Sequence, residues 1–258
     1  MTKYCQVESD DFVLTVTIDR PEVLNSLHPE ASFELAEVFD AFESDTQHRV
    51  AIVTGAGERA FCAGLDLKSQ AASDSLPEAP LTGFAGLTER YGGTKPIIAA
   101  VNGIAAGGGF ELALACDLVI ASETARFSLP EPRIGLAALA GGIHRLSRQI
   151  PLKHAMGMLL TGRNVMAAEG VQLGFVNEVV PPKELMAAAR RWADQIAEAA
   201  PLSILATKEC AIEGMRFGSV KDAMNAKYPA IERMVKSEDF VEGPKAFVEK
   251  RKPSWKGR

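Results

Sequence analysis

Hydrophobic and polar positions follow two different periods along the chain. Residues 12–18 (FVLTVTI) alternate large apolar side chains with Thr and Val, which predicts a half-buried strand. Across residues 30–45 the apolar side chains recur every third residue from Phe33 to Phe42, which predicts an amphipathic helix. Further apolar runs predict four strands and one short buried helix, at 50–54, 96–101, 118–121 and 175–180 for the strands and 108–116 for the helix. Short strands that alternate with helices are typical of an α/β fold whose strands are buried on both faces.

The pattern becomes purely helical after Pro181. Apolar positions at helical spacing predict helices at 184–199, 202–217, 219–235 and 238–251. We expect these helices to pack on the core or on another subunit, because they carry more apolar surface than a free-standing helix pair can hide. Residues 69–91 are rich in Ser, Ala, Pro and Gly and show no period, which predicts a mobile loop with weak helix.

Composition narrows the class of protein. The chain has 258 residues, 47% of them hydrophobic, and a net charge of -5 from interspersed acids and bases. This composition suits a globular domain with a sizeable core, and the missing basic stripe argues against a nucleic-acid partner. The N-terminus has no apolar stretch typical of a secretory signal. The apolar run at 96–122 is interrupted by Asn102, Glu111 and Asp117, so we expect it in the interior and expect no membrane segment.

Four cysteines stand far apart in the sequence without a CxxC spacing, at positions 5, 62, 116 and 210. This pattern suits buried thiols in a reducing compartment, and we expect a cytoplasmic protein. Cys62 has no obvious base beside it and is interpreted as a small packed residue. The four histidines show no metal-ligand spacing, and there is no GxSxG motif, so the sequence predicts neither a metal site nor a serine nucleophile.

Two glycine turns are the first candidate for chemistry, AGLD at 63–66 and AGGGFE at 106–111. Glycines leave backbone N–H groups accessible, and a helix that begins at the second turn adds the positive end of its dipole. Two such turns together can form an oxyanion hole. Each turn alone is explained as well by a tight corner between a strand and a helix.

Two carboxylates surrounded by apolar residues are the second candidate. Glu111 lies one turn into the predicted helix, and Glu131 stands between two prolines after a strand-like stretch. Isolated buried acids are more often hydrogen-bonded core residues than catalysts. Two of them beside a glycine-rich anion site favour an acid/base pair. Asp117, at the end of the same helix, is interpreted as a structural acid.

A third motif, VTGAGERA at 53–60, fits the dinucleotide-binding pattern G-x-G-x-x-A after a strand. That fingerprint requires a helix directly after the glycines and a second strand that ends in an acid. Here the chain continues into a Ser- and Pro-rich loop, so we favour a plain connection between a strand and a turn.

Taken together, several segments resemble the enoyl-CoA hydratase/isomerase (crotonase) superfamily over nearly the whole chain. They are RPEVLNSL (20–27), AFCAGLDLK (60–68), KPIIAAVNGIAAGGGFELALACD (95–117), FSLPE (127–131), LTGRNVMAAEGVQLGFVNEVV (160–180) and AFVEKRKPSW (246–255). The resemblance implies an α/β spiral of repeated ββα units over residues 1–200, which binds and converts an acyl-CoA thioester. It implies a helical C-terminal region, residues 201–258, that forms a homotrimer or a dimer of trimers.

The resemblance also implies roles for individual residues. The backbone N–H groups of Leu65 and Gly108 match the two donors that bind the thioester oxygen, and Glu111 and Glu131 match the two catalytic glutamates of the hydratase branch. The remaining matched positions are expected to contact CoA, and they are Ala63, Gly64, Asp66, Lys68 and Gly107 on one subunit and Phe247 and Lys250 on its neighbour. No metal or redox cofactor is expected, because CoA is part of the substrate.

One departure from the family pattern concerns the acyl group. Hydratases of this family often carry a Pro-Gly pair after the second glutamate, where this chain has Ala138 and Leu139. This departure points to an acyl group other than that of ordinary straight-chain enoyl-CoA. The resemblance as a whole implies, as the primary hypothesis, hydration or dehydration of an α,β-unsaturated acyl-CoA. The alternatives are a double-bond isomerase, a dehydratase for an unusual acyl-CoA and, from another class, a non-catalytic binding module such as an RNA binder.

Overall fold

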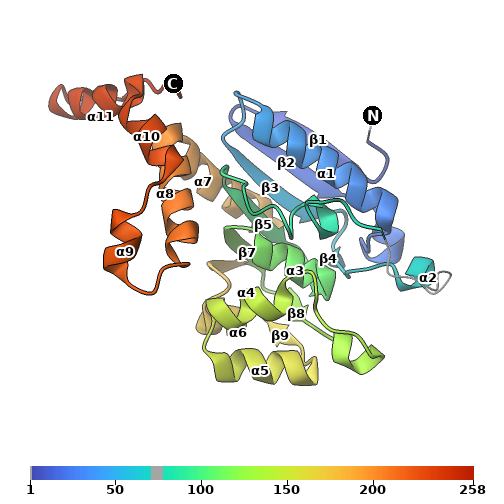
Figure 1. The fold of residues 1–258 in the computed structure, drawn as a ribbon. Coiled ribbons are helices and arrows are strands. Elements are labelled where there is room, and N and C mark those ends of the chain that lie inside the picture. Colours follow the sequence, from blue (N-terminus) through green and yellow to red (C-terminus); the bar gives the residue numbers. More distant parts are fainter. Residues whose placement is uncertain (1, 71–77) are drawn as a thin grey trace.

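A six-stranded sheet forms the centre of the molecule in the computed structural model, which describes residues 2–70 and 78–258 (Figure 1). The strand order is β1-β2-β3-β5-β7-β10, where β1 pairs antiparallel with β2 and the other pairs are parallel. The strand bounds are β1 Cys5–Asp10, β2 Val13–Ile18, β3 Val50–Gly55, β5 Ile97–Val101, β7 Leu118–Ser122 and β10 Glu178–Val180.

A second sheet of four short strands stands beside the first, in the order β4-β6-β8-β9. Its strands are β4 Ala60–Cys62, β6 Ile104–Ala106, β8 Arg126–Ser128 and β9 Val165–Met166. The strand pairs β3/β4, β5/β6 and β7/β8 each give one strand to the large sheet and the next to the small one. A helix follows each pair, namely α2 (Leu67–Gln70), α3 (Gly108–Ala115) and the short 3-10 helix η3 (Glu131–Ile134). This repetition confirms the predicted α/β class and the ββα spiral.

Alternation along the central strands divides their side chains between two apolar layers. Val13, Ile52 and Ile98 belong to the layer that packs against α7 (Leu185–Ala197). Their neighbours along the strands belong to the larger layer, which also contains the apolar face of α1 (Pro29–Ser44) and most of α3. The strands are therefore covered on both faces, as the apolar runs predict.

Two element predictions are wrong. The strand expected at 175–180 covers only β10, because Phe175 and Val176 donate their N–H groups to Gly170 O and close the end of α6 (Ala167–Leu173). The single helix expected at 219–235 is two helices, α9 (Val220–Asn225) and α10 (Pro229–Val235). Pro229 starts the second one, and a proline cannot continue a helix from the preceding turn.

The remaining helices complete the chain: η1 Pro21–Val23, η2 Phe84–Gly86, α4 Gly142–Gln149, α5 Leu152–Thr161, η4 Pro182–Glu184, α8 Pro201–Gly214 and α11 Glu238–Val248. Within the region predicted as a mobile loop, 69–91, the structure describes the end of α2 and η2, while residues 71–77 lie outside the described residues. Among the described helices, none combines the length and the apolar character needed to cross a membrane.

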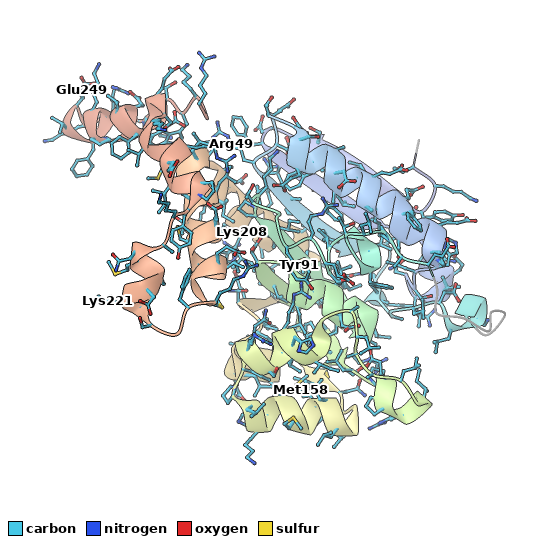
Figure 2. The ribbon with its side chains drawn as sticks, viewed as in Figure 1. Arg49, Tyr91, Met158, Lys208, Lys221 and Glu249 are labelled. Carbon is cyan, nitrogen blue, oxygen red and sulfur yellow. The ribbon has the colours of Figure 1, made fainter. Side chains whose placement is uncertain are left out.

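The C-terminal helices α8 to α11 extend away from the sheets (Figure 1). Figure 2 shows Lys208 on the side of α8 that faces the core, where its Nζ donates to Asp117 Oδ2 (2.7 Å) and to Lys95 O (2.9 Å). Asp117 Oδ2 also accepts the N–H of Ile97 at 2.8 Å. These contacts support the interpretation of Asp117 as a structural acid.

Candidate active site

The two glycine turns lie directly against each other. Gly64 follows β4 with φ 92°, and a Cβ placed on it would lie 2.7 Å from Ala106 O and 3.0 Å from the backbone nitrogen of Gly108. Gly107 caps the N-terminus of α3 with φ 53°. Both residues need the left-handed backbone conformation that glycine adopts without steric cost. The close approach of the two turns therefore depends on the absence of side chains.

Two backbone N–H groups at this junction have no acceptor in the described parts of the chain. Leu65 forms a parallel bridge with Leu27, in which the bonds run from Leu27 N–H to Gly64 O and from Asp66 N–H to Leu27 O. The N–H of Leu65 takes no part in this bridge. Gly108 is the first residue of α3, so its N–H has no partner within the helix. Both predicted donors are thus available to a ligand.

Glu111 lies one turn into α3 and is 3% exposed. Its Oε1 accepts the backbone N–H of Gly142, the first residue of α4, at 2.8 Å. Burial raises the pKa of Glu111 to about 7, the Gly142 bond opposes this rise, and the charge of Glu131 adds to it. A carboxyl with this pKa exchanges a proton readily near neutral pH.

Glu131 begins η3 and is 9% exposed. Its Oε1 would lie 3.0 Å from a Cβ placed on Gly107, so the carboxyl borders the turn that presents the Gly108 N–H. Its buried Oε2 has no hydrogen-bond partner among the described residues. Burial raises the pKa of Glu131 above its ordinary value. An unpartnered buried carboxyl oxygen is costly unless a ligand, water or proton satisfies it, which favours a functional role.

The structure brings some of the other predicted residues to this junction and leaves two far away. Ala63, Asp66 and Lys68 continue from the first glycine turn into α2, and Asp66 Oδ2 forms an ion pair with Arg20 at 3.2 Å. Phe247 and Lys250 lie at the end of α11, at the opposite end of the molecule from α2. Figure 2 labels Glu249, between them in sequence, at this remote end. Within one chain these two residues are not part of the site.

Phe84 and Gly142 border the candidate site but were not predicted from the sequence, where Ala138 was noted only as a departure from the family pattern. The ring of Phe84 on η2 would lie 2.9 Å from a Cβ on Gly108, so it stands against the proposed donor. Gly142 binds Glu111, and the buried Ala138 approaches Gly142 from the same loop. The Gly141-Gly142 pair was the signal available in the sequence. Leu139 is 75% exposed, so Ala138 rather than Leu139 occupies the space beside Gly142.

The alternative motifs have ordinary structural roles. In VTGAGERA the strand β3 runs into a turn and then into β4, which confirms the interpretation as a connection without a dinucleotide-binding helix. Cys62 is fully buried, and burial raises the pKa of its thiol to about 12. In the described ranges no group of three or more His, Cys, Asp or Glu side chains is arranged to hold a metal ion.

Gly109 offers a test of how tightly α3 packs on β4. A Cβ at this position would lie 1.9 Å from Cys62 O, a backbone atom that cannot move without displacing β4. We expect Gly109→Ala to lower the free energy of unfolding by about 3 kcal/mol or more, as measured by chemical denaturation. The matched control is Gly157→Ala in α5, where nothing lies within 4 Å. It should raise the free energy of unfolding by up to about 1 kcal/mol. Equal stability of the two variants would contradict this packing.

Comparisons with known proteins show what the chain as a whole is similar to. Residues 8–258 match the family described as Enoyl-CoA hydratase/isomerase. The chain is 48% identical to the carnitinyl-CoA dehydratase of Proteus mirabilis, with 95% of each chain covered, and 44% identical to that of Escherichia coli, with 100% of each covered. Among solved structures, it superposes on an enoyl-CoA hydratase from Mycobacterium tuberculosis with a TM-score of 0.91 at 38% identity, covering 99% of each chain. An enoyl-CoA hydratase from Bacillus anthracis gives a TM-score of 0.91 at 33% identity, covering 99% of this chain and 100% of that one.

Proposed function

Because the chain belongs to the enoyl-CoA hydratase/isomerase family, we propose that it catalyses the reversible addition of water to an α,β-unsaturated acyl-CoA thioester. The observation that carries this proposal is the junction of the two glycine turns. There two N–H groups that have no acceptor among the described residues lie beside two buried carboxyls with raised pKa values. The enzyme is a hydro-lyase, and the same site performs the dehydration of a 3-hydroxyacyl-CoA in reverse.

The reaction assigns a task to each group. The oxygen of water attacks the β-carbon, and one carboxylate, Glu111 or Glu131, accepts the proton that the water loses. The π electrons move toward the α-carbon, and negative charge develops on the thioester oxygen, which the N–H groups of Leu65 and Gly108 stabilise. The other carboxyl, protonated, delivers its proton to the α-carbon. Two coupled carboxyls in a buried site cannot both ionise easily, which keeps one in each protonation state.

We also propose how CoA is held. The segment Ala63–Lys68, with Gly64 and Asp66 in it, and Gly107 contact the CoA part of the substrate, and Phe247 and Lys250 reach it from a neighbouring subunit. The reaction requires no metal or redox cofactor. We place Phe247 at a neighbouring subunit's site because its side chain is 85% exposed and lies far from the site of its own chain.

The C-terminal helices support an oligomer. Several large apolar side chains there are more than two-thirds exposed in the single chain: Met215, Val220, Met224, Val241, Phe247 and Val248. Such an apolar surface suits an interface between subunits. We expect light scattering to give the mass of a trimer or a dimer of trimers. A monomer at micromolar concentration would contradict the proposal that Phe247 and Lys250 act across subunits.

The acyl group is proposed to resemble that of carnitinyl-CoA. The curated relatives at 44–48% identity are carnitinyl-CoA dehydratases, whereas the solved enoyl-CoA hydratases quoted above are 33–38% identical. The pair Ala138–Leu139, in place of the family's Pro-Gly, lies in the loop that precedes Gly142, the residue bound to Glu111, and Leu139 is exposed. An unusual acyl-CoA dehydratase is therefore the more specific form of the proposed function.

The test is a spectrophotometric screen of CoA esters that includes carnitinyl-CoA, the unsaturated ester that its dehydration gives, and straight-chain enoyl-CoA substrates. We expect hydration or dehydration activity, with the highest kcat/KM on the carnitine-derived pair. The highest kcat/KM on a straight-chain ester would reject the more specific form and leave the hydro-lyase. Migration of the double bond without uptake or loss of water would instead identify an isomerase and reject the hydro-lyase proposal.

The raised pKa of Glu111 predicts how stability depends on pH. As the pH rises above the ordinary value of 4.5, the carboxyl ionises in the unfolded chain but stays protonated in the folded chain until about pH 7. The unfolded state binds fewer protons in this window, so the folded chain loses up to about 3 kcal/mol of stability as the pH rises through it. At lower pH both states are protonated and the loss disappears.

Glu111→Gln cannot ionise and should escape this loss. Denaturation at both ends of the pH window should show the variant more stable than wild type at the upper end and similar to it at the lower end. Glu184→Gln, at an exposed position in η4, is the matched control and should follow wild type. Parallel pH curves for Glu111→Gln and wild type would contradict the burial of a titrating carboxyl at this position.

A further inference from the structure

Arg145, in the first turn of α4, joins the loop that borders Glu111 to the segment that follows η2. Its Nη2 donates to Thr88 O, just after η2, at 2.7 Å, and its Nη1 donates to Ala140 O at 3.5 Å. Gly141 has φ 100°, and a Cβ placed on it would lie 2.0 Å from Arg145 Nη1. The guanidinium therefore lies directly against the loop that precedes α4 and links this loop to the segment around Thr88.

That loop carries the groups that hold the Glu111 carboxyl. Gly142 N–H donates to Glu111 Oε1 at 2.8 Å, and a Cβ on Gly142 would lie 2.9 Å from both Cγ and Oε1 of Glu111. The backbone N–H of Ala140 also acts on this carboxyl and lowers its pKa. Residues 140–142 thus form a backbone cradle around Glu111, and one end of this cradle is held by Arg145.

The guanidinium of Arg145 has no ion-pair partner among the described residues. Its hydrogen bonds run to the backbone carbonyl groups of Thr88 and Ala140. Its positive charge lowers the pKa of Glu111 and opposes the effect of burial, while Glu131 on η3 acts in the opposite direction. On the η2 side, Arg90 is paired with Asp40 at 2.7 Å and Glu89 is exposed. Arg145 thus acts on Glu111 with a charge that no described carboxylate neutralises in an ion pair.

We propose that Arg145 is a positioning residue for the proposed hydration, because its guanidinium fixes the 140–142 cradle that orients the Glu111 carboxyl for proton transfer. The catalytic part of this inference rests on the proposed function. The contact between the cradle and Glu111 does not depend on it. A displacement of about 1 Å at a reacting group can lower the rate by about two orders of magnitude, so loss of this tie is expected to affect kcat more than KM.

The test compares Arg145→Met, Arg145→Lys and a control on the same helix, Arg148→Met. Arg148 is exposed and donates to His144 O within α4. Two quantities are measured: the kcat and KM for the preferred CoA ester, and the titration midpoint of the Glu111 carboxyl by carbon-13 NMR. The carboxyl signal is assigned by its absence in Glu111→Gln.

Arg145→Met should lower kcat at least about tenfold with little change in KM, and should move the Glu111 midpoint to higher pH because a positive charge is removed. Arg145→Lys should keep the midpoint near that of wild type and still lose kcat, since an ammonium group cannot span both carbonyls as the guanidinium does. Arg148→Met should match wild type in both measurements.

Each outcome of these measurements bears on the inference in a defined way. If wild type converts no CoA ester but the Glu111 midpoint rises in Arg145→Met, the proposed function fails and the positioning inference fails with it, while the electrostatic contact between Arg145 and Glu111 stands. An unchanged midpoint together with unchanged kcat in Arg145→Met overturns the inference. Should Arg145→Met fail to fold, Arg145→Lys carries the test, and wild-type kcat in that variant overturns the inference.

Discussion

Replacement of either Glu111 or Glu131 by glutamine is expected to lower kcat for hydration by about 10²–10⁴-fold, with a much smaller change in KM. Glutamine keeps the size of the side chain and can still accept the N–H of Gly142 at position 111, but it neither takes nor gives a proton. The loss should therefore fall on the chemical step. Steady-state kinetics on the preferred CoA ester measure it.

The same two variants separate the roles of the carboxyls. Exchange of the α-proton with deuterated water, followed by NMR, should be lost in the variant that lacks the proton donor to the α-carbon. It should persist in part in the other variant. Glu184→Gln, at an exposed position, controls for the substitution itself. Turnover close to wild type in either buried variant would rule out a mechanism with two carboxyls.

Gly108→Pro is the second substitution with a large expected effect. Proline is well tolerated at the first position of a helix, where Gly108 stands, because the N–H there makes no bond within the helix. The substitution removes the donor that we assign to the thioester oxygen. Loss of one oxyanion donor lowers kcat by about 10²–10³-fold, and kcat/KM should fall by at least this amount.

Gly108→Ala is the matched control for this variant. Both substitutions place a Cβ where it would lie 2.9 Å from the ring of Phe84, so both require the same movement of that side chain. Alanine keeps the N–H and proline does not. The difference in kcat/KM between the two variants therefore measures the loss of the donor together with the ring Cδ that takes the place of its hydrogen. Equal activity of the alanine and proline variants would show that this N–H does not bind the substrate.

Much of the core was predictable because its elements are long and periodic. The alternation in β2 and the three-residue spacing in α1 follow from the layers that they border, so the pattern indicates the burial directly. The strands β4, β6 and β8 are three residues long, too short for a period to be visible. Their position depends on pairing with strands distant in the sequence, which no local pattern encodes.

The part of the candidate site that could be predicted is the pair of ionisable side chains that stand among apolar residues in the sequence. Glu111 and Glu131 stand out in the sequence because ionisable groups are rarely placed among apolar residues without a purpose. The partner of Glu111, Gly142, is 31 residues away, and the glycine pair at 141–142 does not indicate which carboxyl its backbone N–H will bind. Phe84 lies in a stretch without periodicity, so its contact with Gly108 follows only from the folded chain.

The central claim is that the N–H groups of Leu65 and Gly108 bind one carbonyl oxygen. Infrared difference spectroscopy of an enoyl-CoA labelled with carbon-13 at the thioester carbonyl, bound to Glu131→Gln to slow turnover, tests it most directly. We predict that the carbonyl stretch moves to lower frequency on binding, and that the shift shrinks in the double variant that also carries Gly108→Pro. A bound substrate whose carbonyl frequency equals that in water would contradict the account.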